Sequence, residues 1–262
     1  MAWLQRLRDW RDARTLRERA IPEPLWQWLL ASYPFLRQRS NDDLAELRRL
    51  SSLFLGRKEF TGAQGLVVDD HIAVAIAAQA CLPVLRLGLD AYDGFVGIVV
   101  QPDEVVAPRE VMDDDGVVHA YDEYLTGEAM EGGPVMLAWA DVASAGESAE
   151  IAYNVVIHEF AHVLDMADGL ADGVPLLPSG AARERWIEVL DEEYALFCER
   201  VDAGEHTTLD PYGAEAPEEF FAVAAEAFFV AARAMRHEHP ALYAQLAGYF
   251  RQDPAAWDLA AG

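Results

Sequence analysis

The chain has 262 residues, 52% of them hydrophobic and 25% charged, which is the composition of an ordinary soluble globular protein. Its formal net charge of −25 argues against nonspecific nucleic-acid binding, and it has no uninterrupted apolar run of membrane-spanning length. With two cysteines and no secretion signal after the Arg-rich N-terminus, we expect a cytoplasmic protein with buried thiols at Cys81 and Cys198.

The first part of the chain is predicted to be helical and is weakly basic. Residues 1–60 hold 12 Lys and Arg against 8 Asp and Glu, net +4, so the remainder is net −29. Residues 2–19 have the spacing of an amphipathic helix, packed on the body or, alternatively, lying on a membrane surface. Further helices are predicted at 25–32 and from a cap at Asn41 to a stop at Gly56.

The middle of the chain has strand patterns around one buried helix. Short strands are expected at 58–60 and 66–68, followed by an Ala-rich apolar helix capped by Asp69 or Asp70. Further strands are predicted at 96–100, as a central strand, at 105–112 and 117–121, as a hairpin with an acidic turn at 113–116, and at 135–139. From its place in the chain, the last strand is expected to border a substrate cleft.

The most specific motif is His158-Glu159-x-x-His162, within the apolar stretch 155–165. Residues four apart share one face of a helix, so both histidines can bind one metal ion. Glu159 lies about 100° round the helix and can take a proton from metal-bound water, as in zinc hydrolases. The alternative is a buried helix with two hydrogen-bonded histidines; the apolar flanks and the helix end at Gly169 favour one zinc ion per chain.

The remaining sequence is mainly helical. Helices are predicted at 183–201, 220–232 and 242–250, linked by a Gly-rich loop at 168–180, a turn at 210–213 and a surface connector at 237–239. We expect one compact α+β domain over residues 1–262, with a small mixed sheet and with 1–56 as a helical N-terminal extension.

A third zinc ligand is expected from the helix that follows residue 217. Glu219 and Glu226 are seven residues apart on one side of an apolar helix, where an unpaired carboxylate is costly. One would ligate the metal and the other would contact a ring nitrogen of a ligating histidine, and spacing alone does not decide which. Tyr212 lies on a turn from which its phenol can donate to an oxyanion; an ordinary turn tyrosine is the alternative.

These motifs resemble those of the Mlc titration factor A family of zinc metallopeptidases. The resemblance covers nearly the whole chain from residue 53 onward and is carried by the segments 53–58, 76–83, 133–137, 154–165, 210–212, 217–223 and 252–254. The catalytic segment is also similar to the peptidase domain of anthrax lethal factor, a gluzincin-type protein with a zincin-like fold. The N-terminal fifty residues match only loosely.

The resemblance implies that His158, His162 and Glu219 ligate zinc, that Glu159 is the general base and that Tyr212 stabilises the oxyanion. It also implies aminopeptidase-type activity and binding of a transcriptional repressor, Mlc, in the regulation of sugar uptake. The first hypothesis is therefore a zinc-dependent peptidase acting on peptides. The alternatives are a partner-binding regulator whose acidic body sequesters a DNA-binding protein, with a structural or vestigial metal, and a hydrolase of non-peptide amides.

Overall fold

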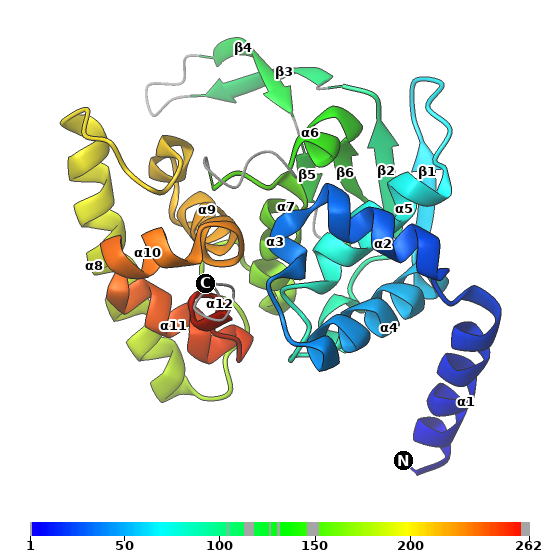
Figure 1. Ribbon diagram of the computed structural model, residues 1–262. Coiled ribbons are helices and arrows are strands. Elements are labelled where there is room, and N and C mark those ends of the chain that lie inside the picture. Colours follow the sequence, from blue (N-terminus) through cyan, green and yellow to red (C-terminus); the bar gives the residue numbers. More distant parts are fainter. Residues whose placement is uncertain are drawn as a thin grey trace.

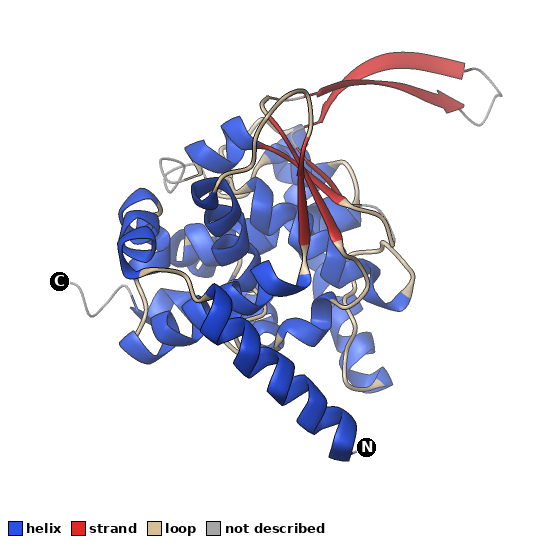
Figure 2. Ribbon diagram, turned by 90° about the vertical axis from the view of Figure 1, so that its right-hand side faces the viewer, coloured by secondary structure: helices blue, strands red, loops and turns tan. Residues whose placement is uncertain are grey.

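The computed structural model describes residues 2–103, 105–112, 118–125, 127–129, 132–145 and 152–257. It is a mainly helical α+β structure with a four-stranded sheet and a two-stranded hairpin (Figures 1 and 2). The expected α+β class is confirmed. No helix among the described residues is both long enough and apolar enough to cross a membrane.

The sheet is small and mixed, as expected. In spatial order its strands are β1 (Glu59–Gly62), β2 (Gly97–Gln101), β6 (Val135–Ala138) and β5 (Gly127–Ala129). The first three are parallel, and β5 runs antiparallel to β6. The strand predicted at 96–100 is central, and its Ile98 and Val100 are fully buried.

The strand expected at 66–68 is absent, and the prediction of two strands around a turn was wrong there. β1 pairs instead with β2 in parallel register, Glu59 opposite Gly97. After β1 the chain makes a tight turn in which Leu66 N donates to Ala63 O at 2.9 Å. The edge of β1 that a hairpin partner would need is thus not used by residues 66–68.

The position of β6 corrects a second prediction. β6 was expected to pair with substrate as an added strand, but Val135 pairs with Ile98 of β2 on one side and with Ala129 of β5 on the other. In the described sheet β5 is the end strand, and it contacts helix α7 (Val155–Asp165). Chain order could not reveal this, because the short strand β5 had no recognisable pattern of its own.

The hairpin expected in the middle of the chain is confirmed. Strands β3 (Val105–Met112) and β4 (Val118–Leu125) pair antiparallel and extend away from the body (Figure 2). The second strand is four residues longer at its end than the sequence pattern indicated. The acidic turn predicted at 113–116 lies outside the described residues.

The N-terminal helices were mostly anticipated. They are α1 (Ala2–Arg19), α2 (Glu23–Ser32), α3 (Pro34–Arg37), which was missed, and α4 (Asn41–Arg57). The cap of α4 is Ser40 rather than Asn41, since Ser40 Oγ accepts a hydrogen bond from Asp43 N at 3.1 Å. Gly56 does not stop the helix. It allows α1 to approach, because a Cβ there would lie 2.4 Å from Thr15 Cγ2.

The core helices hold α7 from two sides. Helix α5 (Asp70–Cys81), capped by Asp69, packs between α4 and α7, and α7 in turn packs against α9 (Pro217–Val230) (Figure 1). The thiol of Cys81 is buried as expected, whereas Cys198 is only partly buried. Because α5 and α9 lie in different parts of the sequence, this packing joins the two halves of the chain around α7.

An aromatic cluster fixes the apolar side of α7. The ring of Phe160 lies 5.0 Å from that of Tyr92, 5.6 Å from Phe95 and 5.7 Å from Phe54, measured between centroids. All four side chains are buried, and edge-to-face or tilted contacts at this spacing are favourable. The cluster therefore sets the rotation of α7 and turns its polar side chains the other way.

The rest of the chain is helical. Its elements are α6 (Trp139–Ser144), α8 (Gly180–Asp202), α10 (Ala232–Glu238), α11 (Pro240–Phe250) and α12 (Pro254–Trp257); α8 and α11 were predicted, whereas α6, α10 and α12 were not. The prediction of a surface connector at 237–239 was wrong. His239 is 4% exposed and its Nδ1 lies 2.8 Å from Glu193 Oε2, while Glu238 accepts hydrogen bonds from Arg200 and Thr208. These contacts tie α10 to α8, which sequence spacing could not show.

Candidate metal centre

Helix α7 begins at a buried hydrogen-bonded cap. Asn154 Oδ1 accepts from Ile157 N at 2.9 Å, and Asn154 Nδ2 donates to Gln79 Oε1 of α5 at 2.7 Å. Both side chains are buried, so each polar group needs a partner and has one. The first turn of α7, which carries His158, is thereby attached to α5.

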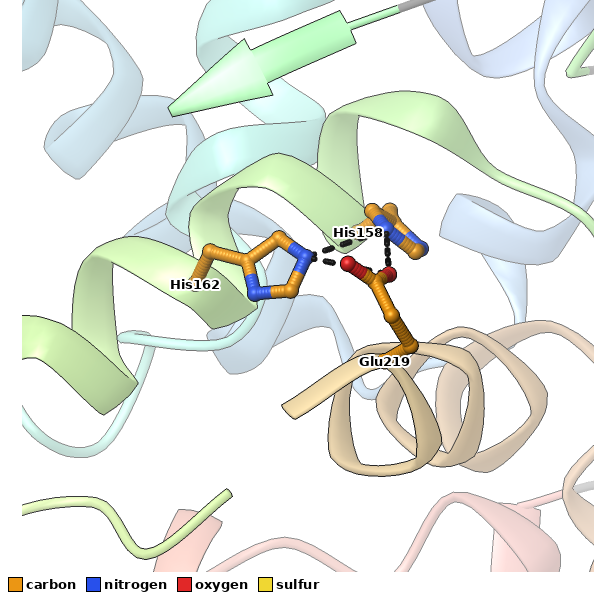
Figure 3. Close-up of side chains that lie close together, drawn as sticks. All are labelled: His158, His162 and Glu219. Carbon is orange, nitrogen blue, oxygen red and sulfur yellow. Dashed lines mark hydrogen bonds and ion pairs between the residues drawn. The ribbon is translucent and has the colours of Figure 1, made fainter. Parts of the chain in front are cut away.

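The two histidines and Glu219 converge on one point (Figure 3). The Nε2 atoms of His158 and His162 are 3.1 Å apart. Glu219, in the first turn of α9, places Oε2 at 3.0 Å from the first of these nitrogens and 3.4 Å from the second. Among the described residues this is the group of three whose ligand atoms lie close enough to hold one metal ion.

The triangle has the size that a tetrahedral zinc site requires. With zinc–nitrogen and zinc–oxygen bonds of about 2.0–2.1 Å and tetrahedral angles, ligand atoms lie roughly 3.3 Å from one another. The three separations of 3.0, 3.1 and 3.4 Å are close to that value. Two imidazoles and one carboxylate are also a ligand set of catalytic zinc, which leaves a fourth position for water.

Glu226 occupies the other side of His158. Its Oε1 lies 2.8 Å from His158 Nδ1, and its Oε2 accepts from Asn154 N. An ionised carboxylate only accepts, so Nδ1 donates its proton to Glu226, and in the neutral ring that a metal ligand requires the Nε2 lone pair would point toward Glu219 and His162. Of the two roles left open by the spacing of Glu219 and Glu226, the geometry gives the ring-nitrogen contact to Glu226.

The electrostatics of this cluster favour a cation at its centre. Burial on its own lowers the pKa of His158, but hydrogen bonds to Glu219 and Glu226 outweigh it and raise that pKa well above its ordinary value. Burial opposes ionisation of Glu219, yet the hydrogen bonds to His158 and His162 lower its pKa to about 2. The negative charge concentrated here has to be balanced, by a proton or by a metal ion.

Glu159 lies beside this group in a nearly dry environment. Its side chain is 4% exposed, and burial raises its pKa to about 7, against the opposing attraction of His158 and His162. A carboxylate whose pKa lies near neutral pH can both accept and return a proton. The sequence motif predicts the role of general base for Glu159.

Tyr212 lies at the entrance of the cluster. It belongs to the 3₁₀ turn Pro211–Ala214, which Asp210 caps through a 2.9 Å hydrogen bond from Tyr212 N. Its ring centroid is 6.1 Å from that of His158, and its side chain is 42% exposed. The tertiary structure thus brings together the residues predicted from the sequence: His158, Glu159, His162, Tyr212, Glu219 and Glu226.

Sequence reasoning assigned no role to three supporting residues. Asn154 and Gln79 form the buried link described above, and an Asn just before an apolar helix was a usable cap signal. Asp165, at the last residue of α7, accepts from Gly173 N at 2.9 Å and holds the following loop against the helix. Its burial in that loop could not be foreseen from the motif.

We predict that Asn154→Ala destabilises the protein by about 2–4 kcal/mol, because it removes a helix cap and leaves the buried Gln79 Oε1 without its donor. Urea unfolding measures the change. Asn41→Ala is the matched control: this exposed residue is not the cap of α4, so its loss should change stability by less than about 0.5 kcal/mol. Equal effects of the two substitutions would contradict the prediction.

Comparison with known proteins identifies relatives along nearly the whole chain. Residues 7–251 match the model of the glucose-regulated metallo-peptidase M90 family. An uncharacterized protein of Synechocystis is 37% identical, covering 94% of this chain and 90% of that protein. A protein named Mlc titration factor A from Salmonella arizonae is 34% identical, and the match covers 88% of this chain and 92% of that protein. A protein of the same name from Pectobacterium atrosepticum is 35% identical, and the match covers 88% of this chain and 87% of that protein.

Proposed function

The chain belongs to the glucose-regulated metallo-peptidase M90 family, and from this premise we propose that it is a zinc-dependent peptidase of the aminopeptidase type. The observation that carries the proposal is the triangle of His158 Nε2, His162 Nε2 and Glu219 Oε2, which has zinc-like spacing. We further propose a gluzincin-type site in a zincin-like fold, similar to the anthrax lethal factor peptidase domain, in one domain over 1–262 with 1–56 as a helical extension.

In this proposal one zinc ion is held by His158, His162 and Glu219. Zinc bound there would act as a Lewis acid toward a water molecule and the substrate carbonyl. Glu226 keeps the proton on His158 Nδ1 and so keeps Nε2 available as a ligand atom.

In this proposal Glu159 transfers the proton and Tyr212 stabilises the oxyanion. Glu159 accepts a proton from the attacking water and then passes it to the leaving amine. Burial of Glu159 supports this role, since a buried carboxylate with a pKa near 7 binds and releases protons readily. The phenol of Tyr212 donates a hydrogen bond to the oxyanion as it forms.

Zinc dependence tests the proposal directly. We expect chelator-treated protein to lose hydrolysis of a panel of amino-acid anilides and short peptides, and one equivalent of zinc per chain to restore it. Binding to the folded state alone also stabilises it, by about 2.7 kcal/mol when free zinc is 100 times Kd. Zinc binding without turnover of any substrate would argue against the peptidase and for a regulatory role.

A second proposed function is binding of a DNA-binding transcriptional repressor of the Mlc type. It rests on the relatives named Mlc titration factor A and on the net −29 of residues 61–262, which complements a basic DNA-binding surface. A purified repressor of this type should bind with an affinity that falls as salt rises. Glu159→Gln should leave this binding unchanged, which separates it from catalysis.

A further inference from the structure

A cavity lies at the C-terminal end of α7, where Val163 follows the metal-centre residue His162. It has a volume of about 510 Å³ and is bounded by the end of α7, by residues 90–95 before β2 and by the start of β6. Val163 in its wall is four residues after Glu159, so it continues the same face of α7 about 6 Å further along the axis. Met166, also in the wall, begins the 3₁₀ turn Met166–Asp168 that follows α7. We call this space the α7 cavity.

The lining of the α7 cavity is apolar with an acidic end. Its walls include Phe95, Val135, Val163 and Met166, and among the described residues that line it the ionisable side chains are Asp90 and Asp93, with no Lys, Arg or His. Arg57 lies 3.4 Å from Asp90, and Lys58 attracts Asp93, but both cations line a neighbouring cavity, so Asp93 is the carboxylate that this cavity offers to a ligand. The volume lies within the roughly 300–1,000 Å³ of typical ligand pockets.

We propose that the α7 cavity binds a lysine or arginine side chain of the peptide substrate; this inference rests on the proposed peptidase function. The aliphatic stem lies against Val163 and Met166, and the charged end lies at Asp93. Long basic side chains bury their methylene groups on apolar walls while the charge stays near water or a carboxylate. An acidic substrate residue would meet Asp93 and be disfavoured.

The position of the cavity suits a residue close to the scissile bond. Val163 directly follows His162, and Ala129 at the end of β5 pairs with Val135 in the cavity wall. A peptide added along β5 would therefore pass the proposed zinc site and reach the α7 cavity with a neighbouring side chain.

The test compares anilides of lysine, norleucine, alanine and glutamate, which share the same free α-amine. Norleucine has the lysine stem without its charge, so the ratio of kcat/KM for the two isolates the side-chain ammonium. For the zinc-loaded wild type we expect lysine to exceed norleucine by about 10-fold, and Asp93→Asn to reduce that ratio to near one. Asp191→Asn, an exposed position on α8, is the charge-matched control and should leave the ratio unchanged.

A second variant tests the apolar wall. Val163→Phe places a larger side chain into the cavity and should lower kcat/KM for lysine and norleucine by about 10-fold relative to alanine, while Val163→Ala should not. Calorimetric binding of Lys-Ala-Ala and norleucine-Ala-Ala to zinc-loaded Glu159→Gln protein, with and without Asp93→Asn, reads out the same contact without turnover.

The outcomes separate the two proposals. If the wild type turns over none of the substrates with zinc bound, the peptidase function fails and this site fails with it. If the wild type is active but Asp93→Asn leaves the lysine-to-norleucine ratio unchanged, only the α7 cavity proposal is overturned. An equal fall for both substrates would place the α-amine, and not the side chain, at Asp93 and would also overturn it.

Discussion

Glu159→Gln should retain zinc and lose hydrolysis, with kcat falling by about 10²–10⁴-fold, the usual contribution of a general base. Gln has nearly the shape of Glu but cannot accept the proton of the attacking water. Glu159 is buried beside His158 and His162 without belonging to the ligand triangle, so the metal site should stay intact. Steady-state kinetics on anilides, together with zinc content per chain, measure both halves of the prediction.

Two controls make that result interpretable. Thermal unfolding of the variant with and without zinc should match that of the wild type, because the substitution changes neither the ligands nor the packing volume. Equal rates for wild type and variant would point to a contaminating peptidase or to a different active site. Loss of zinc together with activity would mean that Glu159 holds the metal, contrary to the geometry.

Glu219→Gln should weaken zinc binding more than Glu226→Gln does. Glu219 Oε2 lies 3.0 and 3.4 Å from the two Nε2 atoms, where it supplies both a ligand atom and a negative charge. Glu226 acts through His158 Nδ1 at 2.8 Å, and removal of such an outer partner usually costs 10–100-fold in affinity or activity. We therefore expect Glu219→Gln to raise the zinc Kd by more than about 100-fold.

Competition with a chromophoric chelator measures the zinc affinities of the wild type, Glu219→Gln and Glu226→Gln. Glu218→Gln, the same change at the adjacent residue about 100° round the helix, is the matched control and should bind zinc like the wild type. The assignment of the ligand would be wrong if Glu226→Gln removed the metal and Glu219→Gln kept it.

The roles of Glu219 and Glu226 could not be told apart from the sequence and follow only from the tertiary structure. Their spacing of seven placed both on one side of an apolar helix but could not rank them, because the ranking depends on how α9 crosses α7. In the structure the first turn of α9 faces the Nε2 atoms, and Glu226, two turns on, faces Nδ1 of the same ring. The crossing angle depends on how the surfaces of both helices pack, so the sequence of either helix alone does not predict it.

Gly56 and strand β6 are two features of the fold that were also misread from local sequence. A Gly near the end of a helical pattern reads as a stop, yet Gly56 is there because α1 approaches it closely. The strand before α7 reads as an edge, yet β5 covers it. For Gly56 the deciding partner, helix α1, is remote in sequence. For β6 the deciding partner, strand β5, is too short to have a recognisable sequence pattern.

The sequence by itself determined the helix of His158, Glu159 and His162, the buried helix after Asp69, the central strand and the hairpin, because each depends on local periodicity or capping. The end of the first helix was predicted too late: α7 ends at Asp165, and the left-handed Gly169 ends the 3₁₀ turn that follows it. The tertiary structure alone decided the partners of these elements: which carboxylate faces which imidazole nitrogen, which strand ends the sheet and where a cavity opens beside α7. Local rules act over a few residues, whereas Gln79, Asn154, His158 and Glu226 meet only because α5, α7 and α9 pack together and bring their buried polar groups within hydrogen-bonding distance.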